Sequence, residues 1–291
     1  MRIAFTHNLQ TLPGEAHAEF DTAATIAALR SALVSLGHEV HLVEVSGSAA
    51  RLVARLESLR PDLVFNTAEG SHGRYREAFY PALFEQLQLA YTGSGAYACA
   101  LTLDKRATKM LVDAAGVPTP KFAWIESEAD AEKVSLRFPV MLKPNFEGSS
   151  KGIDQRSVVE NETELRERAA ELLARFPHGL LAEEFIVGRD VTVPFLALAS
   201  PATGGVLSAA SYHFDAAQTG HRRYEIYDYE LKSELSDAVS VEVPAPLPDA
   251  VAKELGRLTR VVIDTLQLED LARVDFRITD QGEIFFIEAN A

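Results

Sequence analysis

The sequence predicts a mixed α/β protein in which a unit with a parallel sheet precedes two α+β units. Short apolar runs alternate with stretches of helical spacing through about residue 97, which is the pattern of β-α-β units. A glycine- and proline-rich segment at 116–120 then marks the entry into a second unit. The chain of 291 residues is longer than a single core usually supports, so we expect units at about 1–97, 98–179 and 180–291.

The first unit is expected to contain parallel strands at residues 3–5, 40–45 and 63–65. Between the first two, residues 22–36 place Ile26, Leu29 and Leu33 at helical spacings, and Gly37 follows as a helix stop. Parallel strands need crossover connections of this kind, so helices should flank the sheet.

The two later units should combine further strands and helices. A helix at 103–115 leads into strands at 122–125, 140–143 and 153–159, followed by a helix at 162–175. The last unit should hold strands at 180–185, 191–199 and 206–212, a helix at 248–266, and closing strands at 272–278 and 283–288. Residues 213–247 lack a clear period, and we expect them to form a long mobile loop.

The composition argues against several classes of function. With 42 acidic and 28 basic residues, the formal net charge of -14 disfavours general binding to nucleic acid or to an anionic membrane. Cys99 is the single cysteine, so no intrachain disulfide can form, which fits a reducing cytoplasm. The N-terminus lacks the apolar run of a signal peptide, and no later stretch is long enough to span a bilayer. We therefore expect a cytoplasmic protein with small-molecule partners.

Residues 143–152 form a glycine- and serine-rich loop after an apolar run. Such a loop can present backbone N–H groups and hydroxyls to phosphates, and Lys143 would add a positive charge. An ordinary hairpin with a solvated lysine explains the same residues equally well, because a glycine-rich loop is a weak motif and the spacing is not that of a Walker loop.

The closing strands carry a cluster of charged and amide side chains. Alternation places Arg273 and Asp275 on one face of the first strand, and Glu288 and Asn290 on one face of the second. On neighbouring strands, Asp275, Glu288 and Asn290 would form an all-oxygen site suited to Mg²⁺. Arg273 could then offset negative charge that develops nearby. A salt bridge between Arg273 and a carboxylate on a solvated face is the alternative.

Residues 180–186 combine an apolar strand with the acidic pair Glu183 and Glu184. Extended backbone beside apolar side chains can hydrogen-bond an adenine edge, and a nearby carboxylate can hold ribose hydroxyls. A strand whose polar edge faces water is the simpler explanation of this segment taken alone.

Taken in order, these motifs resemble those of the D-alanine–D-alanine ligase family of the ATP-grasp superfamily. The likeness covers the whole chain and rests on Tyr91-Thr92-Gly93-Ser94, Lys105, Lys143 with its loop, Glu183-Glu184-Phe185, Lys232, Arg273-Val274-Asp275 and Glu288-Ala289-Asn290. The resemblance implies an ATP-grasp fold, α/β and α+β, preceded by an N-terminal β-α-β domain with a parallel sheet.

The resemblance also implies an activity. The γ-phosphoryl group of ATP would pass to a substrate carboxylate, and an amino group would attack the resulting acyl phosphate to form an amide, with release of ADP and phosphate. ATP binding is implied for Lys105, Lys143, Glu147, Gly148, Ser149, Ser150, Glu183, Glu184, Phe185, Ile186, Asp190 and Lys232. Mg²⁺, or Mn²⁺ in its place, would be bound by Asp275, Glu288 and Asn290.

Three residues are implied in catalysis. Arg273 would stabilise the tetrahedral intermediate, and Ser150 would link the loop to the first amino-acid subsite. The ammonium group of the first substrate would be anchored by a glutamate, for which Glu19 is preferred over Glu15 because it immediately precedes the first helix.

The sequence departs from the family pattern in places that bear on amino-acid specificity. Residues 66–70 contain no histidine where the family often has one, and His72 is a nearby candidate. Ser233 follows Lys232 where many members have a tyrosine. The chain ends at Ala291, before the segment that shapes the second substrate subsite, so we expect a product truncated at its C-terminus.

The default hypothesis is a D-alanine–D-alanine ligase of peptidoglycan and cell-wall synthesis, acting as a monomer or a homodimer. An ATP-grasp ligase for another amino acid or amine would use the same activation and differ in its amine pocket. A nucleotide-binding module without ligase activity is a further hypothesis, but such a module has no need of Arg273. An enzyme that stops at the acyl phosphate is the last alternative.

Overall fold

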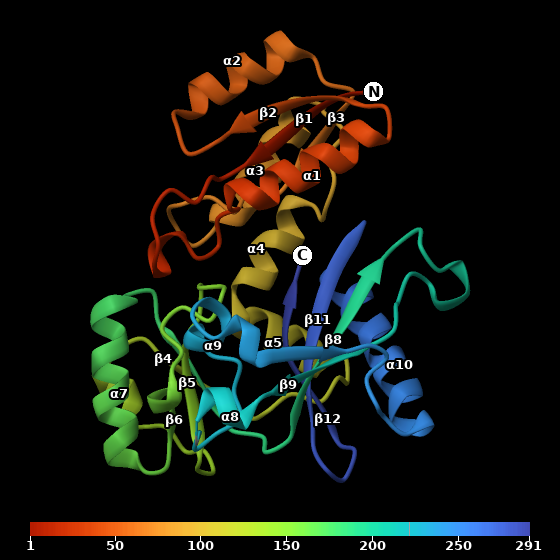
Figure 1. Cartoon of the computed structure of the whole chain (residues 1–291). Coiled ribbons are helices and arrows are strands. Elements are labelled where there is room, and N and C mark those ends of the chain that lie inside the picture. The colour runs from red at the N-terminus through yellow and green to blue at the C-terminus, as the bar shows by residue number, and fades with distance from the viewer. Residues whose placement is uncertain (221) are drawn as a thin grey trace. The chain divides into compact units, whose positions relative to one another are not determined.

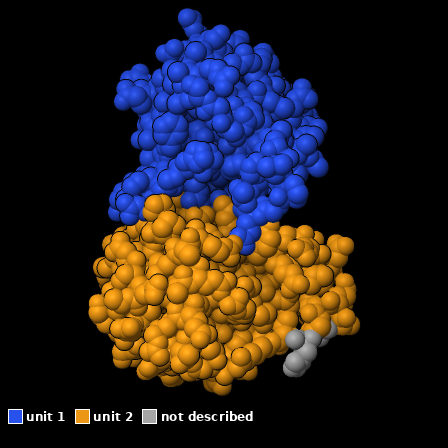
Figure 2. Space-filling model, turned by 90° about the vertical axis from the view of Figure 1, so that its left-hand side faces the viewer, with its two compact units in different colours: residues 1–100 blue, residues 101–291 orange. Residues whose placement is uncertain are grey.

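The computed structural model describes residues 1–220 and 222–291, and these divide into two units, Met1–Ala100 and Leu101–Ala291 (Figure 2). The boundary falls inside α4 (Ala96–Leu103). Among the described residues, no helix is both long enough and apolar enough to cross a membrane.

Unit 1 contains a parallel sheet in the order β2-β1-β3 (Figure 1). Strand β1 (Arg2–His7) runs parallel to β2 (Glu39–Glu44) on one side and to β3 (Leu63–Asn66) on the other. Residues 3–7 of β1 are all buried, as expected for a central strand covered on both faces. The predicted parallel sheet is therefore confirmed.

The connecting helices of unit 1 are α1 (Ala23–Ser35), α2 (Ala49–Leu59) and α3 (Arg76–Gln86). Helix α1 begins where predicted, because the Thr22 hydroxyl accepts a hydrogen bond from the Thr25 N–H at 3.1 Å and caps the helix. Apolar residues of the sheet and of α2 and α3 share one core, which includes Val43, Leu52, Leu56, Val64 and Phe84.

The helix predicted at 103–115 corresponds to α5 (Lys105–Ala114), and the helix before it, α4, was not predicted. Helix α4 ends at Leu103, and α5 begins directly after Asp104. The Asp104 carboxylate accepts hydrogen bonds from the Ala107 N–H at 3.1 Å and from Asn145 Nδ2 at 2.8 Å. Aspartate favours this capping position, so the chain restarts a helix there, with Lys105 as its first residue.

One sheet of unit 2 has the antiparallel order β4-β7-β5-β6. Its strands are β4 (Phe122–Ile125), β7 (Leu180–Glu184), β5 (Val140–Pro144) and β6 (Val158–Val159). The short α6 (Glu128–Ala131) and the longer α7 (Glu162–Arg175) accompany it, and α7 contributes Leu165, Ala169 and Leu172 to the core.

Strand β6 is much shorter than the predicted strand at 153–159. The Asp154 carboxylate accepts a hydrogen bond from the Arg156 N–H at 2.8 Å, and Gln155–Ser157 form a turn of 3₁₀ helix. The side chain of an aspartate competes with strand pairing in this way, which the apolar pattern alone does not reveal.

The other sheet of unit 2 has the antiparallel order β10-β9-β8-β11-β12. Its strands are β10 (Val239–Glu242), β9 (Ala210–Phe214), β8 (Arg189–Leu196), β11 (Leu271–Ile278) and β12 (Ile284–Asn290). Helix α10 (Asp249–Leu266) buries Leu255, Leu258, Val262 and Ile263.

The stretch expected to be one long loop contains regular structure, so that expectation is wrong for much of residues 213–247. Strand β10 pairs with β9, and the short helices α8 (Ala216–Thr219) and α9 (Tyr229–Ser233) lie between them in the chain. His221 lies outside the described residues. These elements are too short to produce a detectable period, and β10 needs its partner strand to form.

Candidate active site

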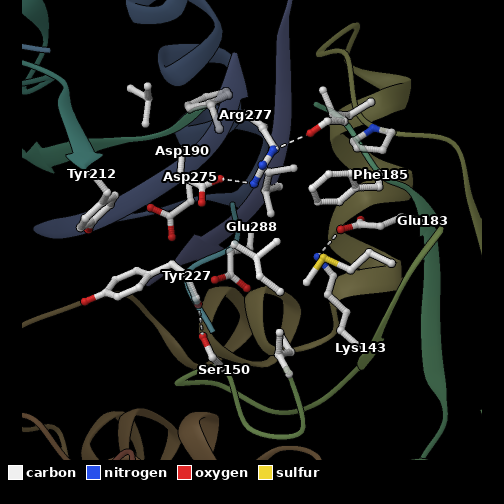
Figure 3. Close-up of a pocket in the computed structure, with 18 of the residues that line it drawn as sticks. Lys143, Ser150, Glu183, Phe185, Asp190, Tyr212, Tyr227, Asp275, Arg277 and Glu288 are labelled. Atoms are coloured by element: carbon white, nitrogen blue, oxygen red, sulfur yellow. Dashed lines mark hydrogen bonds and ion pairs between the residues drawn. The ribbon is translucent and has the colours of Figure 1, made fainter. Parts of the chain in front are cut away.

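Eleven of the residues singled out from the sequence line one pocket of unit 2 (Figure 3). They come from both sheets of the unit and from the segments that follow their strands. The set comprises Lys143, Ser150, Glu183, Glu184, Phe185, Ile186, Asp190, Lys232, Arg273, Asp275 and Glu288.

The glycine- and serine-rich loop follows β5 and is held from two sides. Lys105 Nζ on α5 donates to the Glu147 carbonyl oxygen at 2.6 Å, and Ser150 Oγ donates to the Tyr227 carbonyl oxygen at 2.9 Å. Ser149 and Ser150 have φ values of 47° and 56°, which is unusual for residues other than glycine. Gly148 belongs to the same loop. The backbone is therefore tightly turned, and Ser150 ties it to the segment before α9.

Gly152 closes this loop where a side chain has no room. Its φ is 72°, and a Cβ there would lie 2.6 Å from Cε2 of Phe176. Any other residue would clash with that ring as well as adopt an unfavourable backbone conformation.

One of the carboxylates that line the pocket is buried between two lysines. Glu183 on β7 accepts from Lys143 Nζ at 2.6 Å and pairs with Lys109 Nζ at 2.9 Å. Burial alone would raise the pKa of Glu183, but the two cations hold it below its ordinary value. Burial lowers the pKa of Lys109 to about 8, against the opposing effect of Glu183.

The predicted metal residues lie on paired strands. Arg273 is the Cα partner of Asn290, and Asp275 is the Cα partner of Glu288. The Asp275 carboxylate accepts from Thr192 Oγ1 at 2.5 Å and from Asn290 Nδ2 at 3.3 Å. It also pairs with Arg273 Nη2 at 3.0 Å, so the salt bridge considered as the alternative is present within β11. That contact raises the pKa of Arg273 further.

Positive charges from separate segments gather around Glu288. Lys105 Nζ lies 3.6 Å from Glu288 Oε2. Burial disfavours the charged carboxylate, but Lys105, Lys143, Lys232 and Arg273 together hold the pKa of Glu288 well below its ordinary value. Burial lowers the pKa of Lys232.

The donor set fits a hard cation. Asp275 and Glu288 supply carboxylate oxygens and Asn290 an amide oxygen, which are the ligand types that Mg²⁺ prefers. Among the described residues, no three His, Cys, Asp or Glu side chains gather where they could hold a metal ion. A third ligand oxygen at this place would therefore come from Asn290, from the substrates or from water.

Apolar side chains and the ion pair of Asp190 with Arg277 line another part of the pocket. Phe185 and Ile186 are buried, and Phe185 packs with Val158 and Ile226. Asp190 Oδ1 accepts from Arg277 Nη1 at 2.8 Å. Burial raises the pKa of Asp190, against the opposing charge of Arg277. Glu184 accepts from the Arg137 backbone N–H at 3.1 Å, which directs its carboxylate toward that residue.

Lys109, Thr192, Tyr212, Tyr227 and Arg277 were not singled out from the sequence, although all contact or line the site. For two of them, the spacing from a residue already singled out indicated a place in the site. Lys109 follows Lys105 by four residues and so lies on the same face of α5, and Arg277 follows Asp275 by two on β11. Tyr212 and Thr192 carried no such signal, because such residues are common in strands, and Tyr227 lies in a segment without a period.

Glu19 belongs to unit 1 and is engaged there. Its Oε1 lies 2.8 Å from Arg76 Nη2, and each of the two side chains is only 6% exposed. Glu69 lies close by, and burial together with Glu77 and Glu19 raises its pKa to about 8. The other candidates differ in place: Glu15 is in a 3₁₀ turn (Glu15–His17), and His72 is exposed.

Comparison with known proteins agrees with this geometry. Residues 111–291 match the family model described as the D-ala D-ala ligase C-terminus. The chain is 34% identical over 267 residues to the D-alanine–D-alanine ligase of Aquifex aeolicus, covering 90% of this chain and 82% of that protein. It is 32% identical over 276 residues to the enzyme of Moorella thermoacetica, covering 91% and 82%.

The fold agrees as well. The crystal structure of the D-alanine–D-alanine ligase of Bacillus anthracis matches with a TM-score of 0.75 at 22% identity, covering 100% of this chain and 86% of that one. This likeness identifies the fold as that of the ATP-grasp ligases, as predicted. With a family model over more than half its length and relatives above 30% identity, the chain belongs to the D-alanine–D-alanine ligase family of ATP-dependent, carbon–nitrogen bond-forming ligases.

Proposed function

We propose that this protein joins two D-alanine molecules through an acyl phosphate made from ATP. The observation that carries the proposal is the convergence of Lys105, Lys143, Lys232 and Arg273 on Glu288, beside Asp275. Cations around a carboxylate pair suit a nucleotide triphosphate with a bound divalent cation. The names of the relatives support D-alanine as the substrate.

The lysines would hold the phosphates in place. Lys143 and Lys105 flank the loop at 147–152, whose backbone N–H groups would contact the phosphate oxygens. Glu183 fixes the direction of Lys143. Lys232 would reach the same phosphates from α9, and the desolvated site strengthens each of these charges.

The nucleoside would occupy the apolar part of the pocket. Backbone groups of residues 183–186 would meet the adenine edge, and Asp190 would accept hydrogen bonds from the ribose. Asp275, Glu288 and Asn290 would hold Mg²⁺, which when bound neutralises charge on the transferring phosphoryl group.

Arg273 would act on the second half of the reaction. A carboxylate is a poor electrophile until it is phosphorylated, and the amine then attacks to form a tetrahedral intermediate with a developing negative charge. Arg273 is paired with Asp275 and remains charged at any physiological pH, so its guanidinium is available to stabilise that charge. The contact of Ser150 with Tyr227 would keep water from the acyl phosphate by joining two segments over it.

Glu19 would bind the ammonium group of the first D-alanine. Its pairing with Arg76 orients the carboxylate and leaves the surrounding acidic residues to favour a cation. We also propose two subdomains at about 98–179 and 180–291, joined by β7 of the second, which pairs with β4 and β5 of the first. A cytoplasmic location fits the use of ATP, and a homodimer is proposed on the basis of exposed Val34 and Leu36 near the end of α1.

The experiment is to measure phosphate release from ATP and Mg²⁺ with a panel of single D- and L-amino acids, and to identify products by mass. Phosphate release with D-alanine alone, together with D-alanyl-D-alanine, is the expected result. Release with a different amide would keep the mechanism and replace the substrate. ATP binding without phosphate release for any amino acid would overturn the proposal.

A further inference from the structure

Arg277 is a buried cation in the part of the pocket proposed for the nucleoside, and the proposed reaction gives it no role. It lies on β11, and its side chain is 8% exposed. Its guanidinium carbon is 4.7 Å from the centre of the Phe185 ring. Arg277, Phe185 and Asp190 line the same pocket (Figure 3). Burying a charged side chain beside a binding pocket costs free energy unless the charge is paired and hydrogen-bonded.

Three hydrogen bonds hold the guanidinium, each to a different segment. Nε donates to the Ile186 carbonyl oxygen at 2.5 Å, Nη1 to Asp190 Oδ1 at 2.8 Å, and Nη2 to the Glu225 carbonyl oxygen at 2.6 Å. The first acceptor follows β7, the second is on β8, and the third lies in the segment that leads to α9 and Lys232. A planar fork of five N–H donors can meet these acceptors together, whereas a lysine presents only a single nitrogen.

The register of the sheet directs Arg277 at Asp190. The two residues are Cα partners in the antiparallel pair of β11 and β8, so their side chains share one face. Arg277 engages Oδ1 of the carboxylate. Within the part of the chain that the structure describes, no hydrogen bond to Oδ2 of Asp190 is formed, so this oxygen is available to a ligand in the pocket.

We propose that Arg277 is a positioning residue for ribose recognition, which holds Asp190 with one oxygen toward the pocket and joins it to the segment before Lys232. The inference rests on the proposed nucleotide site. A hydrogen bond to a charged, fixed carboxylate discriminates about 10-fold to 100-fold against a ligand that lacks the hydroxyl. Without Arg277, Asp190 would lose both its orientation and its counter-charge, and this discrimination should disappear.

Arg222 provides a matched control on the same segment. Its side chain is 9% exposed, and it pairs with Asp228 at 2.5 Å and with Glu230 at 2.6 Å. It therefore braces the segment before Lys232 as Arg277 does, but its ion pairs among the described residues are with Asp228 and Glu230 rather than with Asp190. If Arg277 only braced this segment, the Arg222→Met and Arg277→Met variants would behave alike.

The test is calorimetric titration of the whole protein with Mg²⁺ and either ATP, 2′-deoxy-ATP or 3′-deoxy-ATP, without amino acids. The wild type should bind ATP about 10-fold to 100-fold more tightly than at least one deoxy analogue. In Arg277→Met and in Asp190→Asn, the ratio should fall below about threefold, and the double variant should lose no more than either single variant. Arg222→Met should weaken all three nucleotides and preserve the ratio.

Several outcomes would overturn the inference. A full ratio in Arg277→Met, or a wild type that does not distinguish the three nucleotides, would exclude a role in ribose recognition. Arg277→Lys keeps the positive charge but lacks the planar array of N–H donors, so it is the variant to use if Arg277→Met does not fold. An unchanged ratio in Arg277→Lys would overturn the proposal. A wild type that binds no nucleotide would instead count against the proposed function as a whole.

Discussion

Each unit contains a carboxylate whose pKa is strongly shifted, and the two shifts have opposite signs. In unit 1, burial and the nearby Glu77 and Glu19 raise the pKa of Glu69 to about 8, with Arg76 as the opposing cation. In unit 2, burial also disfavours the charge on Glu288, but the surrounding cations lower its pKa well below the ordinary value.

Burial raises the pKa of both carboxylates and is the largest cause of the shift at Glu69. The lowered pKa of Glu288 therefore comes from the cations around it, which outweigh burial. A region with excess negative charge suits a cationic group such as an ammonium, and a region with excess positive charge suits a polyphosphate. The two regions therefore match the two kinds of substrate that a carboxylate–amine ligase must bind.

The largest effect on stability should come from removing Arg76, the buried cation of unit 1 that pairs with Glu19. In Arg76→Met, the Glu19 carboxylate would remain buried without its 2.8 Å partner. We expect the free energy of unfolding to fall by about 3–5 kcal/mol, measured by urea denaturation. Most of this loss should be recovered in the Arg76→Met, Glu19→Gln double variant. A loss below about 1 kcal/mol would mean that unit 1 tolerates its excess of carboxylates without Arg76.

Removing a cation from the pocket of unit 2 should lower the rate of phosphate release. In Lys143→Met, phosphate release should fall about 100-fold to 1,000-fold, because a charge directed at the phosphates is lost. The protein should stay folded, since Glu183 keeps Lys109 at 2.9 Å. Lys133→Met is the control, because Lys133 is 73% exposed and pairs with Asp130 outside the pocket. Equal activity in the two variants would contradict the assignment of the pocket.

A smaller effect is expected for the contact that joins the loop at 147–152 to the segment before α9. Ser150→Ala removes the 2.9 Å hydrogen bond to the Tyr227 carbonyl oxygen, a loss of about 1 kcal/mol. The measurement is the ratio of phosphate released to amide formed. We expect this ratio to rise several-fold, because water would reach the acyl phosphate. A ratio unchanged from that of the wild type would separate Ser150 from the exclusion of water.

A pH dependence of stability is expected in unit 1, and it acts only over a limited range of pH. Because the folded-state pKa of Glu69 is raised to about 8 from 4.5, the folded protein binds a proton more tightly than the unfolded chain. Its contribution to stability is full below about pH 4.5 and is lost as pH rises toward 8. Glu69→Gln should remove this loss, so that the variant gains about 3 kcal/mol over the wild type at pH 8 relative to pH 5. Parallel stability curves for the two proteins across this range would refute the shift.

Much of the fold follows from local pattern. Helix α7 and strand β4 have the predicted bounds, because a helical period over fourteen residues and an apolar run between turn residues each leave little choice. Helix α5 was predicted to within two residues, whereas α4 was not predicted and Asp104 was not recognised as the residue that caps α5. Strand β10 was missed because four residues show no period without the partner strand β9.

The candidate site divides in the same way. Residues at strand ends and in the glycine-rich loop, such as Lys143 and Asp275, were found because their positions follow from alternation and turn chemistry. Lys109 and Arg277 were not, although each is buried against a carboxylate of the pocket. A lysine in a helix or an arginine in a strand is usually solvated, and only the distant partner distinguishes the buried ones.

The parallel sheet of unit 1, the family resemblance and the order of the charged motifs could be predicted from the sequence, because they depend on periods and spacings within short segments. Which charges meet could not be predicted, because it depends on tertiary contacts. Glu183 lies between lysines that are 34 residues apart in the chain, and Arg277 meets three segments at once. Such contacts depend on how strands pair across long separations, and the charge that a carboxylate keeps depends in turn on those contacts.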